Sequence, residues 1–165
     1  MERSELVRRA QQYADRKGSV LKEPLGFGVH GNVFSVEHQS ESARTAIKAH
    51  EQEAAYVRER DVYLRLREHE VSTVRECNVP QLLGYDDELL VIEMTIVARP
   101  FLLDFGGAYL DGGPEFSEEV WADWRSEKQE QFGSFWPEVQ RILAALEGYG
   151  IHVHDVNPGN ISFAD

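Results

Sequence analysis

Cysteine is almost absent from this chain of 165 residues, and its scarcity restricts the chemistry that is open to the protein. Cys77 is the only one, so an internal disulfide and a zinc cage built from several cysteines are both excluded. The chain also lacks an apolar run long enough to cross a bilayer, and its first six residues, MERSEL, contain no apolar core of a secretion signal. We therefore expect a cytoplasmic protein with no membrane partner.

Basic residues are also in short supply. Lysine and arginine number 17 against 29 aspartates and glutamates, which gives a net charge of −12. Binding to nucleic acid or to an anionic membrane needs a basic surface, so this balance argues against both kinds of partner. It fits a cationic or neutral partner, or simply high solubility.

The remaining composition is that of a globular protein. Hydrophobic residues make up 42% of the chain and aromatic residues 10%, which predicts a packed core rather than disorder. The length suits one compact domain, and no internal repeat or low-complexity tract interrupts it. We therefore predict a single domain over residues 1–165.

The first half of the chain alternates between helical and strand patterns. Residues 3–16 and 51–69 carry apolar side chains at helical spacing. Residues 19–49 predict short strands joined by turns, and residues 89–94 form a continuous apolar run of strand length. This order predicts an α+β protein whose sheet is mainly antiparallel.

The second half is predicted to be mostly helical after Pro100. One helix is expected to begin at Ser117, and another to run from Trp136 to Leu146 before Gly148 ends it. The tryptophans on these helices mark either a partner surface or, more simply, buried packing: Trp121, Trp124 and Trp136.

Residues 26–33, Gly-Phe-Gly-Val-His-Gly-Asn-Val, form the first motif that carries chemistry. Glycines let backbone N–H groups approach phosphate oxygens, so Gly26, Gly28 and Gly31 predict a loop that covers phosphates. Dinucleotide sites share the Gly-x-Gly-x-x-Gly spacing, but they need a helix after the loop, whereas a strand pattern follows Gly31. An ordinary glycine-rich hairpin is the alternative.

The next predicted strand carries Lys48 within Ala46-Ile47-Lys48. A lysine between strand apolar residues points into a cleft only where an anion such as phosphate awaits it, and it needs a carboxylate to hold it. Glu59 lies beside the apolar stripe of the following helix and is the predicted partner. Glu53 competes with it and Asp61 does so more weakly, while a surface lysine and a solvated glutamate are the alternative.

The chain resembles the protein-kinase-like superfamily over residues 19–163. Five elements occur in that family's order, namely the glycine loop, Lys48, Glu59, the strand ending Ile92-Glu93-Met94, and the segment from Asp155 to Asn160. The resemblance implies a protein-kinase-like fold. Residues 1–94 would form an antiparallel-sheet amino lobe with its preceding helix, and residues 95–165 a hinge and a reduced helical carboxy lobe.

The resemblance implies ATP as a cofactor. The three loop glycines would cover its phosphates, and Lys48, held by Glu59, would contact the α- and β-phosphates. Val33 and Ala46 would lie against the adenine. Glu93 and Met94 would be the hinge whose backbone bonds the adenine edge, with Ile92 near the gatekeeper position.

The resemblance also implies a catalytic loop and Mg²⁺. Asp155 matches the aspartate that accepts the proton of the attacking hydroxyl, and Asn160 matches the asparagine that holds Mg²⁺. Val153 and His154 replace the first two residues of the family's His-Arg-Asp. The run Asn157-Pro158-Gly159-Asn160 is closer to small-molecule phosphotransferases and atypical kinases, so the hydroxyl acceptor is either a protein serine or threonine or a small molecule.

The run His152-x-His154-Asp155 also invites a zinc-hydrolase interpretation. That motif would continue with Asp and His, where Val156 and Asn157 stand. We therefore expect His152 to be a strand residue and His154 a loop residue near the active aspartate.

The metal-binding Asp-Phe-Gly of the family does not follow the predicted catalytic loop. Only residues 161–165 come after Asn160, too few for the strand pair that leads to it. An Asp-Phe-Gly occurs earlier, at residues 104–106, where we expect a turn or helix start and a chance match. Asp104→Ala is then expected to leave Mg²⁺-dependent nucleotide binding intact. A permuted metal ligand at Asp104 is the alternative, and Asp165 is a second candidate.

Two functions follow from these motifs. The first is an ATP-dependent phosphotransferase with Asp155 as base and Asn160 as metal ligand. The second is a catalytically inactive kinase-like module that binds nucleotide or a partner protein. Retention of Lys48 and Glu59 with the two loop residues favours the enzyme, which is our prediction, while the missing Asp-Phe-Gly favours the module. A third possibility is that the sequence is part of a longer polypeptide.

Overall fold

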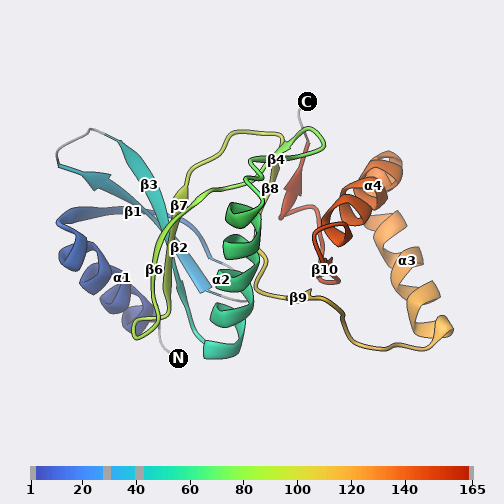
Figure 1. The fold of residues 1–165 in the computed structure, drawn as a ribbon, viewed down its shortest axis with the longest axis horizontal. Helices are drawn as coiled ribbons and strands as arrows, with labels where there is room; N and C mark the ends of the chain where they lie inside the picture. Colours follow the sequence, from blue (N-terminus) through green and yellow to red (C-terminus); the bar gives the residue numbers. More distant parts are fainter. Residues whose placement is uncertain (1–2, 28–30, 40–42, 164–165) are drawn as a thin grey trace.

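The computed structural model describes residues 3–27, 31–39 and 43–163, and it combines α-helices with antiparallel sheets (Figure 1). The predicted α+β class, with a mainly antiparallel sheet in the first half, is confirmed. No helix in the described part of the chain is long and apolar enough to span a membrane.

The first half builds one five-stranded sheet in the order β1-β2-β3-β7-β6, in which every neighbouring pair is antiparallel. Its strands are β1 (Ser19–Phe27), β2 (Gly31–His38), β3 (Arg44–His50), β6 (Leu82–Asp86) and β7 (Val91–Thr95). Because strand side chains alternate between faces, Ile47 points to one side of the central strand β3, while Ala46 and Lys48 point to the other.

Helix α1 (Arg3–Lys17) covers one face of this sheet, and α2 (Glu53–Glu68) lies on the opposite face (Figure 1). The apolar stripe of α1 buries Leu6, Ala10 and Tyr13 with Ile47 and Val91 in a small core of its own. The larger core lies on the α2 face and continues into the second half of the molecule. The sheet therefore separates two cores, and α2 stands between the two halves.

The strand predicted at residues 89–94 begins two residues later than expected, at Val91. Asp86 explains the shift, because its carboxylate accepts the backbone N–H groups of Glu88 and Leu89 and closes a turn there. Leu90 has a left-handed φ of 57°, which belongs to a turn rather than a strand. The apolar character of Leu89 reflects burial rather than strand conformation.

The expectation of mostly helical structure after Pro100 is correct only beyond residue 117. Two short strands come first, β8 (Phe101–Leu102) and β9 (Ala108–Leu110). Helix α3 (Glu118–Phe132) then begins as predicted, with the Ser117 hydroxyl accepting the Val120 N–H. A single 3₁₀ turn, η1 (Gly133–Phe135), leads into α4 (Trp136–Glu147), which Gly148 follows.

The short strands tie distant parts of the second half together. β8 pairs with β11 (Ile161–Ser162), and β9 pairs with β10 (Ile151–Val153). The first pair belongs to a four-stranded sheet, β11-β8-β5-β4, completed by β5 (Cys77–Asn78) and β4 (Thr73–Val74). Residues 101–110 are thus held at both ends against residues 151–162.

Candidate functional site

A cleft of about 540 Å³ lies on the α2 face of the large sheet, where that sheet meets the loops of the second half. Many of the residues predicted for a nucleotide site line it together, namely Gly26, Gly31, Val33, Ala46, Lys48, Glu59, Met94 and Asn160. Gly28 lies outside the described residues. The size is that of a small-molecule site.

The glycine loop needs a glycine at Gly31 for a reason that the sequence did not reveal. Gly31 has a φ of 156°, and a Cβ there would overlap the backbone carbonyl of Ala49 on β3. A Cβ on Gly26 would meet no described atom within 4 Å. Gly31 therefore lets β2 approach β3 closely, whereas Gly26 leaves open space at the cleft.

Lys48 and Glu59 form the predicted ion pair, with Lys48 Nζ 2.7 Å from Glu59 Oε1. Both side chains are buried, at 7% and 1% exposure. The competing carboxylates lie elsewhere, because Glu53 is exposed and Asp61 pairs with Arg60. The helical spacing that placed Glu59 beside the packed stripe of α2 therefore selected the right partner.

Electrostatics keep this pair ionised. Burial disfavours the Glu59 carboxylate, but Lys48 and His50 outweigh burial and hold the pKa of Glu59 well below its usual value. Burial likewise opposes the Lys48 ammonium, but Glu59 and Asp104 keep the pKa of Lys48 above its usual value. The Lys48 ammonium therefore stays charged near neutral pH, paired with the Glu59 carboxylate and next to Asp104.

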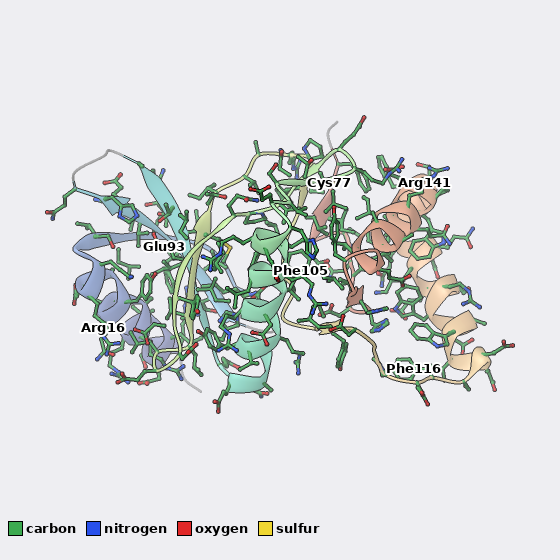
Figure 2. The ribbon with its side chains drawn as sticks, in the orientation of Figure 1. Arg16, Cys77, Glu93, Phe105, Phe116 and Arg141 are labelled. Carbon is green, nitrogen blue, oxygen red and sulfur yellow. The ribbon has the colours of Figure 1, made fainter. Side chains whose placement is uncertain are left out.

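Glu59 also reaches the segment Asp104-Phe105-Gly106. Its second oxygen, Oε2, accepts the Phe105 backbone N–H at 2.6 Å. The Phe105 ring is fully buried beside α2, edge-on to Tyr63 at 5.4 Å between centroids, and Figure 2 shows it at the centre of the molecule. One carboxylate thus joins β3, α2 and this segment.

Asp104 lines the cleft beside Lys48, and a turn follows it at residues 106–107. Its Oδ1 is 3.1 Å from Lys48 Nζ and also accepts the Gly106 N–H. Asp104 lies in the same cleft as Asn160, although it comes 51 residues before Asp155 in sequence.

The strand pair expected between the catalytic loop and an Asp-Phe-Gly is present in the opposite chain order. β11 follows Asn160, and β8 leads into Asp104 through Leu103. The Leu103 N–H donates to the Asn160 carbonyl at 2.7 Å and extends this contact. As expected, the described residues after Asn160 do not form a strand pair by themselves; they supply β11 alone, and β8 supplies its partner from earlier in the chain.

The loop from Asp155 to Asn160 is held by its own side chains. Asn160 is buried, and its Oδ1 accepts the Asn157 N–H at 2.7 Å, while Asn157 Oδ1 accepts the Gly159 N–H at 2.7 Å. This short-range bonding explains the Asn-Pro-Gly-Asn run as an Asx-type turn. The turn directs Asn160 into the cleft.

Asp155 is not among the described residues that line the cleft. Its carboxyl packs directly against Gly107, where a Cβ would overlap both oxygens. The pairing of β9 with β10 brings the two residues together, since Ala108 is opposite Val153. Gly107, which sequence reasoning missed, is the residue that makes room for the predicted base.

The predicted hinge at Glu93 is wrong in register. Glu93 lies within β7 between Ile47 of β3 and Gly84 of β6, so the sheet occupies its backbone. Its buried side chain accepts hydrogen bonds from Tyr13 and Thr45 on the α1 side of the sheet, and Figure 2 labels it there. It is not among the described residues that line the cleft.

The cleft is lined by the residues that follow Glu93. Met94 lines the cleft, so its predicted place is kept, and Thr95, Ile96 and Val97 continue the lining. Ile92 shares the cleft-facing side of β7 with Met94 but is fully buried. Met94, and not Ile92, therefore faces the open cleft, and the chain leaves the sheet after Thr95.

The histidines of the second half lie as predicted, His152 in β10 and His154 in the loop that follows. His154 packs against Gly113 and the Trp121 ring, and burial first, then His152, lowers its pKa. Within residues 3–27, 31–39 and 43–163, no group of three or more His, Cys, Asp or Glu side chains could hold a metal.

The tryptophans surround a second hollow of about 430 Å³ between α3, α4 and β10. Trp136 is buried, while Trp121 and Trp124 are half-buried, and the Trp124 Nε1–H donates to the His154 carbonyl at 2.7 Å. Packing explains Trp136, and the other two indoles support the turn before Asp155.

Comparison with known proteins leaves the site to be interpreted from its own geometry. No family model matches the chain, and no curated protein matches it either. The function therefore has to follow from the arrangement of the residues in the cleft.

Proposed function

We propose that the protein is an ATP-dependent phosphotransferase of the protein-kinase-like type, which transfers the γ-phosphoryl group to a hydroxyl-bearing acceptor. The observation that carries the proposal is the double role of Glu59. One oxygen holds Lys48 at 2.7 Å, and the other holds the Phe105 N–H at 2.6 Å. A cation suited to phosphates and a carboxylate suited to a metal, Asp104, are thereby fixed at one wall of the cleft.

The proposal includes a rearranged order of elements. In protein-kinase-like proteins the catalytic loop leads through a strand pair to the Asp-Phe-Gly. Here the pair β8–β11 connects the same two motifs in space, but Asp104 precedes the loop instead of following it. The contact between Gly107 and Asp155 adds a second link between them. The absence of an Asp-Phe-Gly after Asn160 then no longer favours an inactive module.

ATP would lie with its adenine between the two walls of the cleft. Val33 and Ala46 line the sheet side, and Met94 lies behind them. Ile96 and Val97 follow the last ladder residue of β7 and also line the cleft. Their backbone groups therefore replace those of Glu93 as the proposed partners of the adenine edge.

The residues present fit a Mg²⁺ ion bound together with nucleotide. Mg²⁺ is usually held by one or two carboxylates plus substrate phosphates, and Asp104 supplies the carboxylate. The Asn160 amide oxygen is aimed by its bond from Asn157 and keeps a second lone pair. When bound, Mg²⁺ would neutralise charge on the β- and γ-phosphates.

The chain's own groups would perform the rest of the transfer. Lys48, kept charged by Glu59 and Asp104, would hold the phosphates in place. Asp155 would accept the proton of the acceptor hydroxyl as the hydroxyl oxygen bonds to the γ-phosphorus, while the bond from that phosphorus to the β,γ-bridging oxygen breaks and ADP leaves. Phosphoryl transfer depends mainly on such positioning and charge compensation, which these buried contacts supply.

The test is phosphate transfer from radiolabelled Mg·ATP with the purified chain and two acceptor pools, serine/threonine peptides and small hydroxyl compounds. Water acts as the reference acceptor. Asp155→Asn is expected to lower transfer about 10²- to 10⁴-fold, the usual share of a general base, while nucleotide binding stays intact. Equal transfer by both forms would rule out Asp155 as base. Nucleotide binding without transfer to any acceptor would favour the inactive module.

A further inference from the structure

We propose that His50 is a positioning residue that holds the Glu59 carboxylate in the orientation that serves Lys48 and Phe105 together. His50 ends β3, two residues after Lys48, and is fully buried. Its effect on transfer rests on the proposed function, but its effect on the geometry of Glu59 does not.

His50 and Lys48 share one oxygen of Glu59. His50 Nε2 lies 2.7 Å from Oε1, and Lys48 Nζ lies 2.7 Å from the same atom. An ionised carboxylate can only accept hydrogen bonds, so Nε2 carries the proton and donates. With two donors on Oε1, the carboxylate turns Oε2 toward the Phe105 N–H.

The imidazole is itself held on every side. The Leu90 carbonyl accepts the His50 backbone N–H at 3.0 Å and lies 3.2 Å from Nδ1, which can donate to it only when both ring nitrogens carry protons. Arg9 of α1 donates to the His50 carbonyl at 3.0 Å, and the Tyr56 ring of α2 meets the imidazole edge-on. These contacts, with the bond from Nε2 to Glu59, fix the place of the ring between β3 and α2.

The second donor matters because Lys48 has two carboxylates within reach. Its Nζ is 2.7 Å from Glu59 and 3.1 Å from Asp104. Without His50, the fully buried Glu59 depends on Lys48 alone for compensation of Oε1. Glu59 then loses its fixed orientation, the Phe105 N–H loses its acceptor, and Asp104 is no longer held in place for a metal.

Two variants separate the hydrogen bond from simple packing. His50→Gln places a side-chain N–H close to the position of Nε2 and can still donate to Glu59. His50→Asn is equally polar but too short, so its amide lies near the position of Nδ1, toward Leu90. The pair therefore differs in the bond to Glu59 more than in polarity or volume.

The first readout is hydrogen exchange of the Phe105 amide in the nucleotide-free protein. In His50→Asn it is expected to exchange about 10- to 100-fold faster than in wild type, the effect of losing one hydrogen bond to a charged group. In His50→Gln it is expected to stay within about threefold of wild type, because the bond is kept. Amides of the β9–β10 pair report whether the fold is unchanged.

Unchanged Phe105 exchange in His50→Asn, or equal acceleration in both variants, would overturn the proposal. The second readout is the Mg²⁺ concentration for half-maximal transfer, expected to rise about 10- to 100-fold in His50→Asn only. If Phe105 exchange is faster in His50→Asn but the wild-type protein transfers no phosphate, the role of His50 stands and the proposed function is wrong. Altered exchange with unchanged Mg²⁺ dependence would overturn the link to Asp104.

Discussion

The two halves of the molecule are built from contacts of very different reach along the chain. In residues 19–95, long strands pair mostly with near neighbours, as β1 does with β2 and β2 with β3. In residues 96–163, strands of two or three residues pair only with distant segments, as Leu102 does with Ile161 and Tyr109 with His152. In the described part of the first half, β3 and β7 alone reach as far, since Lys48 lies opposite Ile92. Local patterns therefore describe the first half well, whereas the second half is organised by pairings that no local pattern records.

The two halves also bring different chemistry to the cleft. The sheet half supplies the glycine loop and the ion pair of Lys48 and Glu59. The other half supplies Asp104 together with Asn157, Gly159 and Asn160. The hydrogen bond from the Phe105 N–H to Glu59, called the joint below, connects the two halves. Changes on either side of this joint test whether the halves act as one site.

The largest effect is expected from Asp104→Asn, which removes the proposed metal carboxylate. Loss of a residue that only orients a metal ligand lowers metal affinity or activity by about 10- to 100-fold. Loss of the ligand itself should lower Mg²⁺-dependent ATP binding and phosphate transfer by more than that. Calorimetric titration with ATP, with and without Mg²⁺, measures the binding. Asp165→Asn is the matched control. Wild-type Mg²⁺ dependence in Asp104→Asn would leave the chance match as the explanation of Asp104-Phe105-Gly106.

A smaller effect is expected from Gly107→Ala, which tests the packing within the second half. The added methyl would overlap the Asp155 carboxyl and push it aside. A displacement of about 1 Å at a reacting group costs about a hundredfold in rate, so transfer should fall by that order while ATP binding is kept. Gly148→Ala is the control, because Gly148 follows α4 with a helical φ of −60° that alanine also adopts. Equal rates in wild type and Gly107→Ala would show that Asp155 is not the base.

The third effect is on stability and concerns the joint itself. The pKa of Glu59 is lowered in the folded protein, so its carboxylate stabilises the fold fully above its unfolded pKa of about 4.3. That contribution is lost as the pH falls below this value toward the folded pKa. The free energy of unfolding should therefore drop by about 1 kcal/mol more per pH unit in wild type than in Glu59→Gln. Urea unfolding of both proteins at pH 6 and at pH 3.5 measures this difference. An equal loss of unfolding free energy in wild type and Glu59→Gln would contradict the lowered pKa of Glu59.

The smallest effect on function is expected from Glu93→Gln, which tests the corrected register of the hinge. Glu93 bonds Tyr13 and Thr45 on the far side of the sheet, so the KM for ATP should change less than about twofold. The free energy of unfolding should fall by about 1 kcal/mol through weaker hydrogen bonds. Thr45→Val is a control on the same network. A large rise in KM with unchanged stability would return Glu93 to the adenine site.

Much of the site in the first half could be predicted from particular residues. Glu59 was found because helical spacing placed it on the packed side of α2, while Glu53 and Asp61 fell elsewhere. His50 was missed, although the two-residue period of β3 puts it on the same face as Lys48. Glu93 was misplaced because an apolar run shows that a strand exists without showing where it leaves the sheet.

The site in the second half was harder to predict for a physical reason. Strands as short as β8 and β11 carry too few residues to show a period, so the region looked helical. Asp104-Phe105-Gly106 was set aside because it came before the catalytic loop, and chain order was the only guide to proximity. The need for glycine at position 107 could not be predicted from its neighbours in sequence, because it comes from the close approach of the distant Asp155 carboxyl.

The sequence by itself determined the α+β class, the antiparallel sheet, the pairing of Lys48 with Glu59 and the turn that presents Asn160. Each depends on residues close along the chain, through helix spacing, strand alternation or a local side-chain bond. Only the tertiary structure decided that Asp104 enters the cleft, that Gly107 seats Asp155 and that Glu93 faces away. Those outcomes depend on which distant strands pair, and such pairing is decided by burial across the whole chain rather than by any one segment of it.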